Sequence, residues 1–288
     1  MQPPTAMAVQ RHGRQWHSGV PAAPPTRAQT VEAMLERTGR KAVPIRRAFI
    51  QSETPDAHGS RGALLARIVH TRDASALDAY LLIHAMASSE PFDTEYPAVS
   101  WVRALGLDSA ATPDAARGHW AKITARLIEL GLIRRERRGN RMAYVLLHED
   151  GTGTPYERPK TGADGLWFSL PHAYWTLGHV QALTLPEKAM LLISLDQRNP
   201  FPLPADRTPS WYGISAATAA RGLAGLRKHG LLMYETNWRI DAKSPTGWAE
   251  ERGYQLLGPY SAAERRAATR APRTRKAPIY FTTSQDSA

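Results

Sequence analysis

The sequence predicts a helix-rich α+β chain in which two units of the same element order follow one another, with disordered segments at both ends. Apolar residues recur at helical spacing in several blocks, and the last helical block of each unit ends at a glycine. After that glycine, each unit continues with a run that alternates apolar and polar residues, as strands of a hairpin do. Because the order occurs twice, one fold repeated in tandem accounts for most of the chain.

The first unit is predicted at residues 73–150. It contains the helical stretches SALDAYLLIHAMA and PAVSWVRALGL, and then a third helix with Thr112 as its N-cap and Pro113 at its first position. Gly131 is expected to end this helix. The following LIRRERRGNRMAYVLL is typical of a β-hairpin that turns at Gly139-Asn140.

A linker rich in Gly, Pro and Thr is predicted at residues 151–165, and the second unit at 166–258. Thr184 begins a capping-box pattern before KAMLLISL, and RTPSWYGI is a further short helical piece. Ser215 is expected to cap the helix AATAARGLAGLRKH, and Gly230 to end it. LLMYETNWRI and RGYQLL then form the expected hairpin.

The two ends of the chain lack these patterns. Residues 1–60 are rich in Pro, Ala, Arg and Gln, and they offer little apolar surface to offset chain entropy. We expect this segment to be largely disordered, with a short helix at 31–40. The basic tail at 261–288 is also low in apolar residues and is expected to be disordered when free.

Composition limits the class of protein. The chain has 37 Lys and Arg against 26 Asp and Glu, a net charge of +11 and a pI near 10.1, which favours nucleic acid as a partner ahead of an anionic membrane. The absence of cysteine excludes disulfides, thiolate zinc sites, iron–sulfur clusters and cysteine nucleophiles. No apolar run approaches the roughly 20 residues of a membrane span. We therefore expect a cytoplasmic protein without a membrane partner.

The sequence offers no motif for catalysis. The histidines form no His-x-His or His-Glu-x-x-His pair, no Gly-Lys-Ser/Thr completes a phosphate loop, and no Gly-x-Ser-x-Gly elbow occurs. A tyrosine recombinase has a comparable length, but no His-x-x-Arg pattern with a downstream Tyr in register is present. We therefore predict that the chain is not an enzyme and has no catalytic residues, no metal site and no cofactor.

The repeat carries a resemblance to a known family. Aligning Gly131 with Gly230 superposes Leu127 on Leu226 and Lys122 on Arg221. Leu-x-x-x-Gly-Leu-[Ile/Leu], closing a capped helix and followed by a hairpin, resembles the winged-helix superfamily of bacterial DNA-binding proteins over roughly 73–150 and 166–258. The tandem arrangement is similar to plasmid replication initiators, which read iterated origin repeats with two winged helices.

The resemblance implies that the third helix of each unit enters the major groove and that the hairpin, or wing, contacts DNA beside it. Small residues such as Ala217 and Gly225 would let the second helix approach DNA closely. Lys and Arg suit guanine edges or phosphates, and an arginine-rich wing suits a minor groove or a phosphate row. The opposing interpretation is that these side chains only solvate the surface. The expected DNA contacts are His119, Lys122, Arg126, Arg135, Arg137, Arg138, Asn140 and Arg141 in the first unit, and Thr218, Arg221, Lys228 and Arg239 in the second.

These observations predict sequence-specific binding of double-stranded DNA, favouring a replication initiator associated with a plasmid or the nucleoid. Two alternatives stay open: a transcriptional regulator, and a non-catalytic protein-interaction module in a nucleoprotein assembly. Besides DNA, the partners to consider are a second copy of the chain and replication or transcription proteins. The basic tail is either an arm that contacts DNA or a solubilising end.

Overall fold

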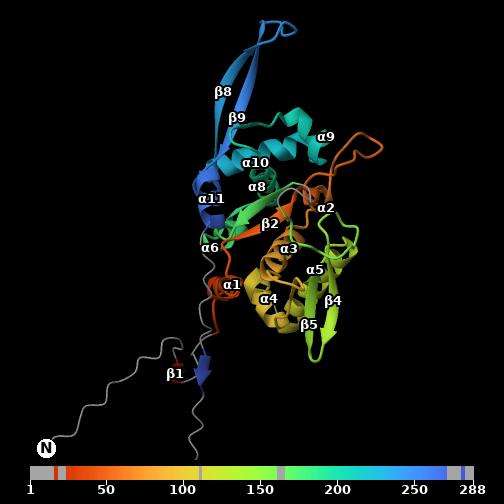
Figure 1. The fold of residues 1–288 in the computed structure, drawn as a ribbon, viewed down its shortest axis with the longest axis vertical. Helices are drawn as coiled ribbons and strands as arrows, with labels where there is room; N and C mark the ends of the chain where they lie inside the picture. Colours follow the sequence, from red (N-terminus) through yellow and green to blue (C-terminus); the bar gives the residue numbers. More distant parts are fainter. Residues whose placement is uncertain (1–15, 19–23, 110–111, 161–165, 271–279, 283–288) are drawn as a thin grey trace, which may run out of the picture.

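The computed structural model describes residues 16–18, 24–109, 112–160, 166–270 and 280–282 (Figure 1). It confirms the α+β class, with about 47% helix and 20% strand. The core extends over both units and over the segment that precedes them. None of the helices in the described ranges combines the length and the apolar character that crossing a membrane requires.

The first unit consists of three helices, a short strand and a hairpin. The short strand β3 pairs with the second hairpin strand β5, so that the sheet order is β3-β5-β4. Its elements are α3 (Ala74–Met86), β3 (Asp93–Thr94), α4 (Ala98–Leu105), the 3-10 turn η2 (Leu107–Ser109), α5 (Pro113–Glu129), β4 (Ile133–Arg138) and β5 (Arg141–Leu146).

Local signals set the ends of α5 as expected. The hydroxyl of Thr112 accepts a hydrogen bond from the amide of Ala115 at 3.1 Å, and Pro113 occupies the first turn. After α5, Gly131 has φ +69° and lies so close to Gly151 that a Cβ atom there would be 2.6 Å from the Gly151 carbonyl oxygen. The predicted cap and the predicted stop are both confirmed.

Aromatic side chains join α4, α5 and the hairpin. The rings of Trp101 and Trp120 stack with their centroids 5.3 Å apart and their planes at 10°. The indole Nε1 of Trp120 donates to the hydroxyl of Tyr144 at 2.8 Å, which satisfies both polar groups in the interior. Because Trp120 lies on the inner face of α5, this contact fixes which face of α5 remains in solvent.

After an opening strand and two short helices, the second unit repeats the order of the first. Its short strand β7 pairs with the second hairpin strand β9, which gives the sheet order β7-β9-β8. The predicted caps at Thr184 and Ser215 are confirmed, since Thr184 forms a capping box with Glu187 and Ser215 accepts from the Thr218 amide at 3.2 Å. Its elements are β6 (Trp167–Pro171), α6 (Ala173–Thr176), α7 (His179–Ala182), α8 (Leu185–Asp196), β7 (Phe201–Pro202), η3 (Ala205–Arg207), α9 (Thr208–Tyr212), α10 (Ala216–Lys228), β8 (Leu232–Ile240) and β9 (Trp248–Leu256).

Helices α8 and α10 pack closely through a glycine. A Cβ atom on Gly222 would lie 2.4 Å from the carbonyl oxygen of Pro186 and 2.5 Å from Cγ of Met190. The helical Gly118 of α5 has open space instead, with no atom within 4 Å of such a Cβ. The same substitution therefore has opposite consequences in the two helices.

We expect Gly222→Ala to lower the free energy of unfolding by about 1–3 kcal/mol, because backbone atoms must move apart to admit the methyl group. Gly118→Ala should raise it by about 0.5–1 kcal/mol, since alanine loses less backbone entropy in a helix and here meets no neighbour. Urea unfolding of both variants measures the difference. Equal effects of the same sign would contradict the packing described for α10.

The N-terminal segment is not disordered over its described part, and the expectation for residues 1–60 is wrong there. It contains α1 (Arg27–Glu36), β2 (Ala42–Arg46), the 3-10 turn η1 (Arg47–Phe49) and, just after it, α2 (Leu64–His70). The helix begins four residues before the stretch predicted at 31–40. Apolar side chains that look sparse in sequence lie in the common core: Val31, Met34, Leu35, Val43, Ile45, Phe49 and Ile50.

Strand β2 finds its partner far along the chain. It pairs antiparallel with β6, from Ala42 opposite Pro171 to Arg46 opposite Trp167. The N-terminal segment thus supplies a strand to a sheet whose other strand opens the second unit. The expectation for residues 1–15 and 19–23 lies outside the described residues.

The predicted linker is packed against the rest of the protein over residues 151–160. Tyr156 is buried, and its hydroxyl shares a hydrogen bond with Nε2 of His84 at 3.3 Å. Its ring packs edge to face against the ring of Phe92. Leu147 and Pro155 form an isolated β-bridge. This stretch is therefore not a free tether; residues 161–165 lie outside the described residues.

Three partly or fully buried ion pairs hold the two units and the N-terminal segment together. Arg46 of β2 pairs with Glu149 at 2.8 Å, and both side chains are at most 5% exposed. Lys188 of α8 pairs with Asp78 of α3 at 2.7 Å, which joins the first long helices of the two units directly. Arg47 pairs with Asp196 at 2.7 Å. These contacts fix how one unit sits against the other.

The C-terminal tail is ordered where it begins. The 3-10 turn η4 (Gly258–Tyr260) leads into α11 (Ala262–Arg270), and the Arg265 guanidinium donates to the carbonyl of Leu195 at 2.8 Å. The expected disorder is therefore wrong for 262–270. Residues 271–279 and 283–288 lie outside the described residues, and between them β10 (Tyr280–Thr282) pairs in parallel with β1 (Trp16–Ser18).

Candidate nucleic-acid interface

The solvent face of α5 carries the first group of predicted contacts. His119 and Lys122 are exposed, whereas Trp120, Ile123 and Leu127 face the core. Spacings of three and four residues keep the exposed positions on one surface. Arg126 is only partly exposed and pairs with Glu129 of the same helix at 2.8 Å. Among the described residues, Lys122 is thus the cation on this face that forms no ion pair.

The two faces of the first hairpin differ in charge. Residues opposite one another across β4 and β5 share a face, and neighbours in sequence alternate. Arg134, Arg138 and Arg141 lie on one face, where Glu136, Asp93 and Glu95 pair with them. Hydrogen bonds from Arg138 and Arg134 hold the pKa of Glu136 below its ordinary value. This face is therefore largely neutralised.

The other face carries Arg135 and Arg137. It is the face of the buried Ile133 and Tyr144, which turns toward α5. Both arginines are exposed, and within the described ranges neither pairs with a carboxylate; Arg137 donates only to the carbonyl of Gly139 at 3.3 Å. The turn residue Asn140 is exposed between the two faces. The exposed cations of the first hairpin that have no carboxylate partner among the described residues thus lie on the side of α5.

We expect this asymmetry to appear in the salt dependence of duplex binding. Arg135→Ala/Arg137→Ala should reduce the slope of log K against log[salt] by roughly 1–2, since each lost phosphate contact removes about 0.9. The matched variant Arg134→Ala/Arg141→Ala should change the slope by less than half as much, because carboxylates already neutralise these side chains. Titrations at five salt concentrations measure both slopes, and equal reductions would refute the assignment of the two faces.

The solvent face of α10 differs in part from the prediction. Thr218 is partly exposed and accepts from the guanidinium of Arg221 at 3.2 Å, while Arg221 and Lys228 are exposed. Gly225, however, faces α8: a Cβ there would lie 1.8 Å from Oε1 of Glu187. The expectation that Gly225 lets this helix approach DNA is therefore wrong, because its role is to admit the Glu187 side chain.

Sequence reasoning missed Arg227. It is exposed on α10, and its guanidinium lies 4.4 Å from the ring centroid of Tyr234 in β8. Arg252 of β9 lies over the same ring at 4.9 Å. The sequence does contain a signal for Arg227. Arg221, Ala224 and Arg227 follow one another at intervals of three residues, so Arg227 lies near the exposed face that Arg221 begins.

The second hairpin is longer than the first and projects from the body of the protein (Figure 1). Arg239 lies in β8 opposite Ala249, but its side chain lies outside what the structure describes. Asp241, Glu250 and Glu251 lie near its end together with Lys243 and Arg252. The first hairpin is thus the more basic of the two, as expected.

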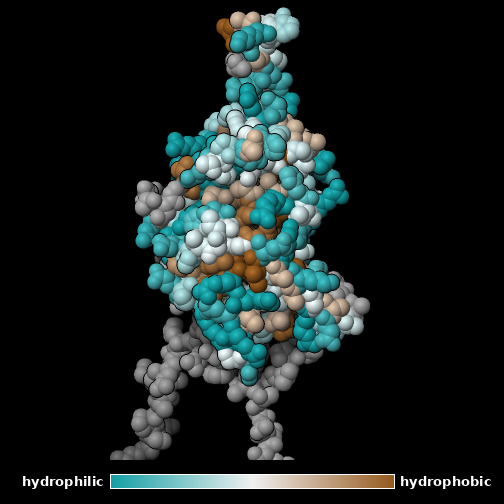
Figure 2. Space-filling model, turned by 90° about the vertical axis from the view of Figure 1, so that its right-hand side faces the viewer, coloured by the Kyte–Doolittle hydropathy of each residue, from teal (hydrophilic) through white to brown (hydrophobic). Residues whose placement is uncertain are grey.

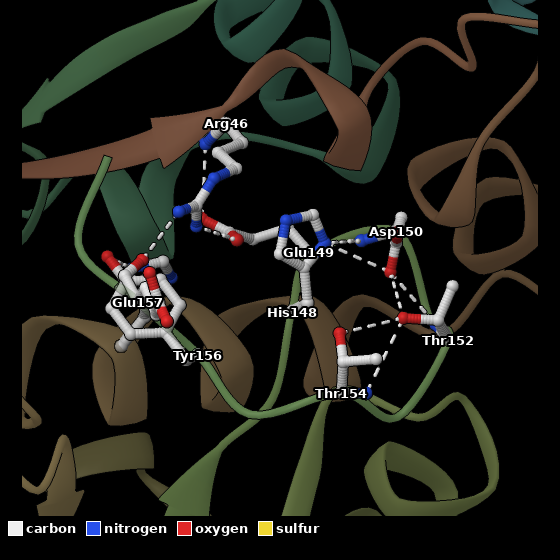
Figure 3. Close-up of polar contacts among 9 residues, drawn as sticks. Arg46, His148, Glu149, Asp150, Thr152, Thr154, Tyr156 and Glu157 are labelled. Atoms are coloured by element: carbon white, nitrogen blue, oxygen red, sulfur yellow. Dashed lines mark hydrogen bonds and ion pairs between the residues drawn. The ribbon is translucent and has the colours of Figure 1, made fainter. Parts of the chain in front are cut away.

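A groove of about 1130 Å³ lies beside the buried Arg46–Glu149 pair, lined mainly by residues 46–67 of the N-terminal segment and by residues 148–157. Figure 3 shows the polar contacts of this ion pair and of the neighbouring turn. Arg46 also donates to the carbonyl of Glu157 at 2.7 Å. Nearby, Asp150 accepts from the amide and the hydroxyl of Thr152 at 2.9 and 2.7 Å and lies 3.0 Å from Nδ1 of His148. These contacts close a turn. Both positively and negatively charged side chains line the groove. Its charge therefore favours neither an anionic nor a cationic ligand.

The described residues contain no cluster of three or more His, Cys, Asp or Glu side chains that could hold a metal ion. Comparisons with protein-family models, with curated proteins and with solved structures found no match to this chain.

Proposed function

We propose that the chain is a non-catalytic, sequence-specific double-stranded DNA-binding protein built from two winged helices. The observation that carries this proposal is the repeated arrangement of helix, short strand, two helices and hairpin, with the short strand paired to the last strand in both units. In each unit the helix that precedes the hairpin presents a cation to solvent at the same repeat position, Lys122 in α5 and Arg221 in α10. A winged helix uses this helix to contact base edges.

The two units are not copies of one surface. The α5 face combines Lys122 with His119, whereas the α10 face combines Arg221 with Arg227 and Lys228. Buried ion pairs fix the units against each other, so that the two helices are presented at one separation. Such a chain reads a long asymmetric site without forming a two-fold dimer, which favours replication initiation over a regulator that reads two half-sites.

The test begins by selecting bound sequences from a pool of random duplexes with the full chain. Fluorescence anisotropy then compares the selected duplex with a shuffled duplex at 50–300 mM salt. We expect the selected duplex to bind at least 10³-fold more tightly than the shuffled one at about 150 mM salt. Equal and steeply salt-dependent binding of both duplexes would leave only a non-specific basic protein.

We expect Lys122→Ala and Arg221→Ala each to weaken binding of the selected duplex about tenfold, and the double variant about hundredfold, because the two sites are far enough apart to act independently. Lys41→Ala and Arg67→Ala remove exposed cations elsewhere and serve as charge-matched controls. Unchanged affinity of the double variant would favour the alternative of a protein-interaction module. The genomic position of the selected sequence, among iterated repeats or at a promoter, separates an initiator from a transcriptional regulator.

A further inference from the structure

The end of the β8–β9 hairpin exposes three large apolar side chains. Trp238 is 64% exposed, Ile240 76% and Trp248 51%. Figure 2 shows hydrophobic and hydrophilic residues side by side at the end of this projection, above a mostly hydrophilic stem. The turn beyond them is held by a hydrogen bond from the Asp241 amide to the Gly247 carbonyl at 2.9 Å. Exposed apolar groups gathered on a structured projection usually mark a contact surface.

Strand register places these three residues on one face. Ile240 is opposite Trp248, and Trp238 lies two residues before Ile240, so their side chains point the same way. Glu235 and Glu251 fall on the opposite face by the same alternation. Glu250 shares the apolar face, but it pairs with Arg252 at 2.9 Å. The apolar face thus carries no unpaired carboxylate among the described residues, which removes the main obstacle to contact with a polyanion.

This face is continuous with the basic face of α10. Its inner residues Leu232 and Leu256 are buried beneath α10, and Tyr234 follows them outward. The guanidinium groups of Arg227 and Arg252 both lie over the Tyr234 ring, and a groove of about 470 Å³ separates α10 from β8 at this point. A duplex that contacts Arg221 and Arg227 therefore lies on the side toward which the apolar residues point.

The length of the hairpin matches the spacing of DNA grooves. From Tyr234 to Ile240 the strand advances six residues, or about 20 Å at about 3.3 Å per residue. Half a helical turn of B-DNA is about 17 Å, which is the offset from a major groove to the next minor groove along the axis. With α10 in a major groove, the end of the hairpin reaches the neighbouring minor groove.

We propose that Trp238, Ile240 and Trp248 form an apolar wedge that enters the minor groove beside the α10 contact and bends the duplex. This inference rests on the proposed DNA-binding function. Apolar side chains that enter a minor groove partly unstack a base step and kink the duplex toward the major groove. The second wing then contributes shape-dependent recognition at flexible pyrimidine–purine steps, in contrast to the ionic contacts of the first wing.

The test uses the full chain and the duplex selected by it, labelled at both ends for resonance energy transfer. Wild type is expected to shorten the end-to-end distance, and Trp238→Ala/Ile240→Ala/Trp248→Ala to abolish the shortening and weaken binding about tenfold. The salt slope should stay unchanged in this variant, because apolar contacts release no counterions. Leu177→Ala, which removes a side chain exposed to 60% elsewhere, is the matched control.

Three results would overturn the wedge. One is a triple variant, folded by circular dichroism, that binds and bends the duplex as wild type does. Another is a wild type that sediments as a dimer and a triple variant that sediments as a monomer with unchanged DNA affinity, which would assign the surface to a second copy of the chain. If wild type selects and binds no duplex at all, the wedge and the proposed function fall together, whereas the first two results leave the function intact.

Discussion

Arg46→Ala is expected to lower the free energy of unfolding by about 3–5 kcal/mol, the usual consequence of leaving a buried charge without its partner. The side chains of Arg46 and Glu149 are 5% and 0% exposed and are joined at 2.8 Å. Arg46 also donates to the Glu157 carbonyl, and its guanidinium lies 5.3 Å from the ring centroid of Tyr156. Truncation therefore leaves the buried Glu149 carboxylate without its partner. It also removes the hydrogen bond that holds Glu157, in the segment that joins the units. Urea unfolding followed by circular dichroism measures the loss.

The control for this variant is Arg126→Ala, which breaks an exposed pair with Glu129 on the surface of α5. We expect a change below about 1 kcal/mol there. A double replacement, Arg46→Met with Glu149→Leu, removes both charges and should recover much of the loss, since a well-packed apolar pair costs no desolvation. An Arg46→Ala variant as stable as Arg126→Ala would mean that this pair does not hold the units together.

Acidification from pH 7 to pH 5 is expected to destabilise the protein by about 4 kcal/mol through two buried histidines. Burial lowers the pKa of His84 and of His172 to about 4. Both histidines titrate near 6.5 when unfolded, so between pH 6.5 and pH 4 the unfolded state binds more protons than the folded state. Stability is therefore complete above about pH 7 and falls as the pH drops through this window, by about 2 kcal/mol for each histidine at pH 5.

Urea unfolding at pH 7, 6 and 5 measures this dependence. His84→Gln and His172→Gln should each remove about half of the decrease, whatever their effect at pH 7. Burial raises the pKa of Asp78 and of Asp196, so the folded state takes up protons at these carboxylates more readily than the unfolded state does. This uptake stabilises the fold in acid, so about 4 kcal/mol is an upper bound on the loss of stability. A stability that stays constant from pH 7 to pH 5 in wild type would show that neither histidine is kept neutral by burial.

Signals within a few residues of each other allowed accurate prediction from sequence. The caps at Thr112, Thr184 and Ser215 and the stop at Gly131 depend on one side chain and its own helix, and all are confirmed. The exposed positions of Lys122 and Arg221 follow from the same helical period. These features are local, so their physical cause is visible in the sequence.

Features that depend on distant partners were not predictable in the same way. The strand AVPIR is short and contains a proline, which disfavours a strand, and its pairing with β6 and the Arg46–Glu149 contact stabilise it. Gly225 lies at a helix position consistent with either face, and the Glu187 side chain decides between them. Strand alternation alone divides the arginines of the first hairpin between two faces. Which face is neutralised depends also on Asp93 and Glu95, which come from β3 and from the residue after it.

The pairing of β2 with β6 also has a consequence for synthesis on the ribosome. Trp167 emerges about 120 residues after Arg46, a delay on the order of ten seconds at about 5–20 residues per second. During this interval the nascent chain carries an open strand edge, and Ile45 lacks its cross-strand neighbour Phe168. The first unit can form helices early, but the strand that precedes it waits for the second, so the two units mature together during translation rather than one after the other.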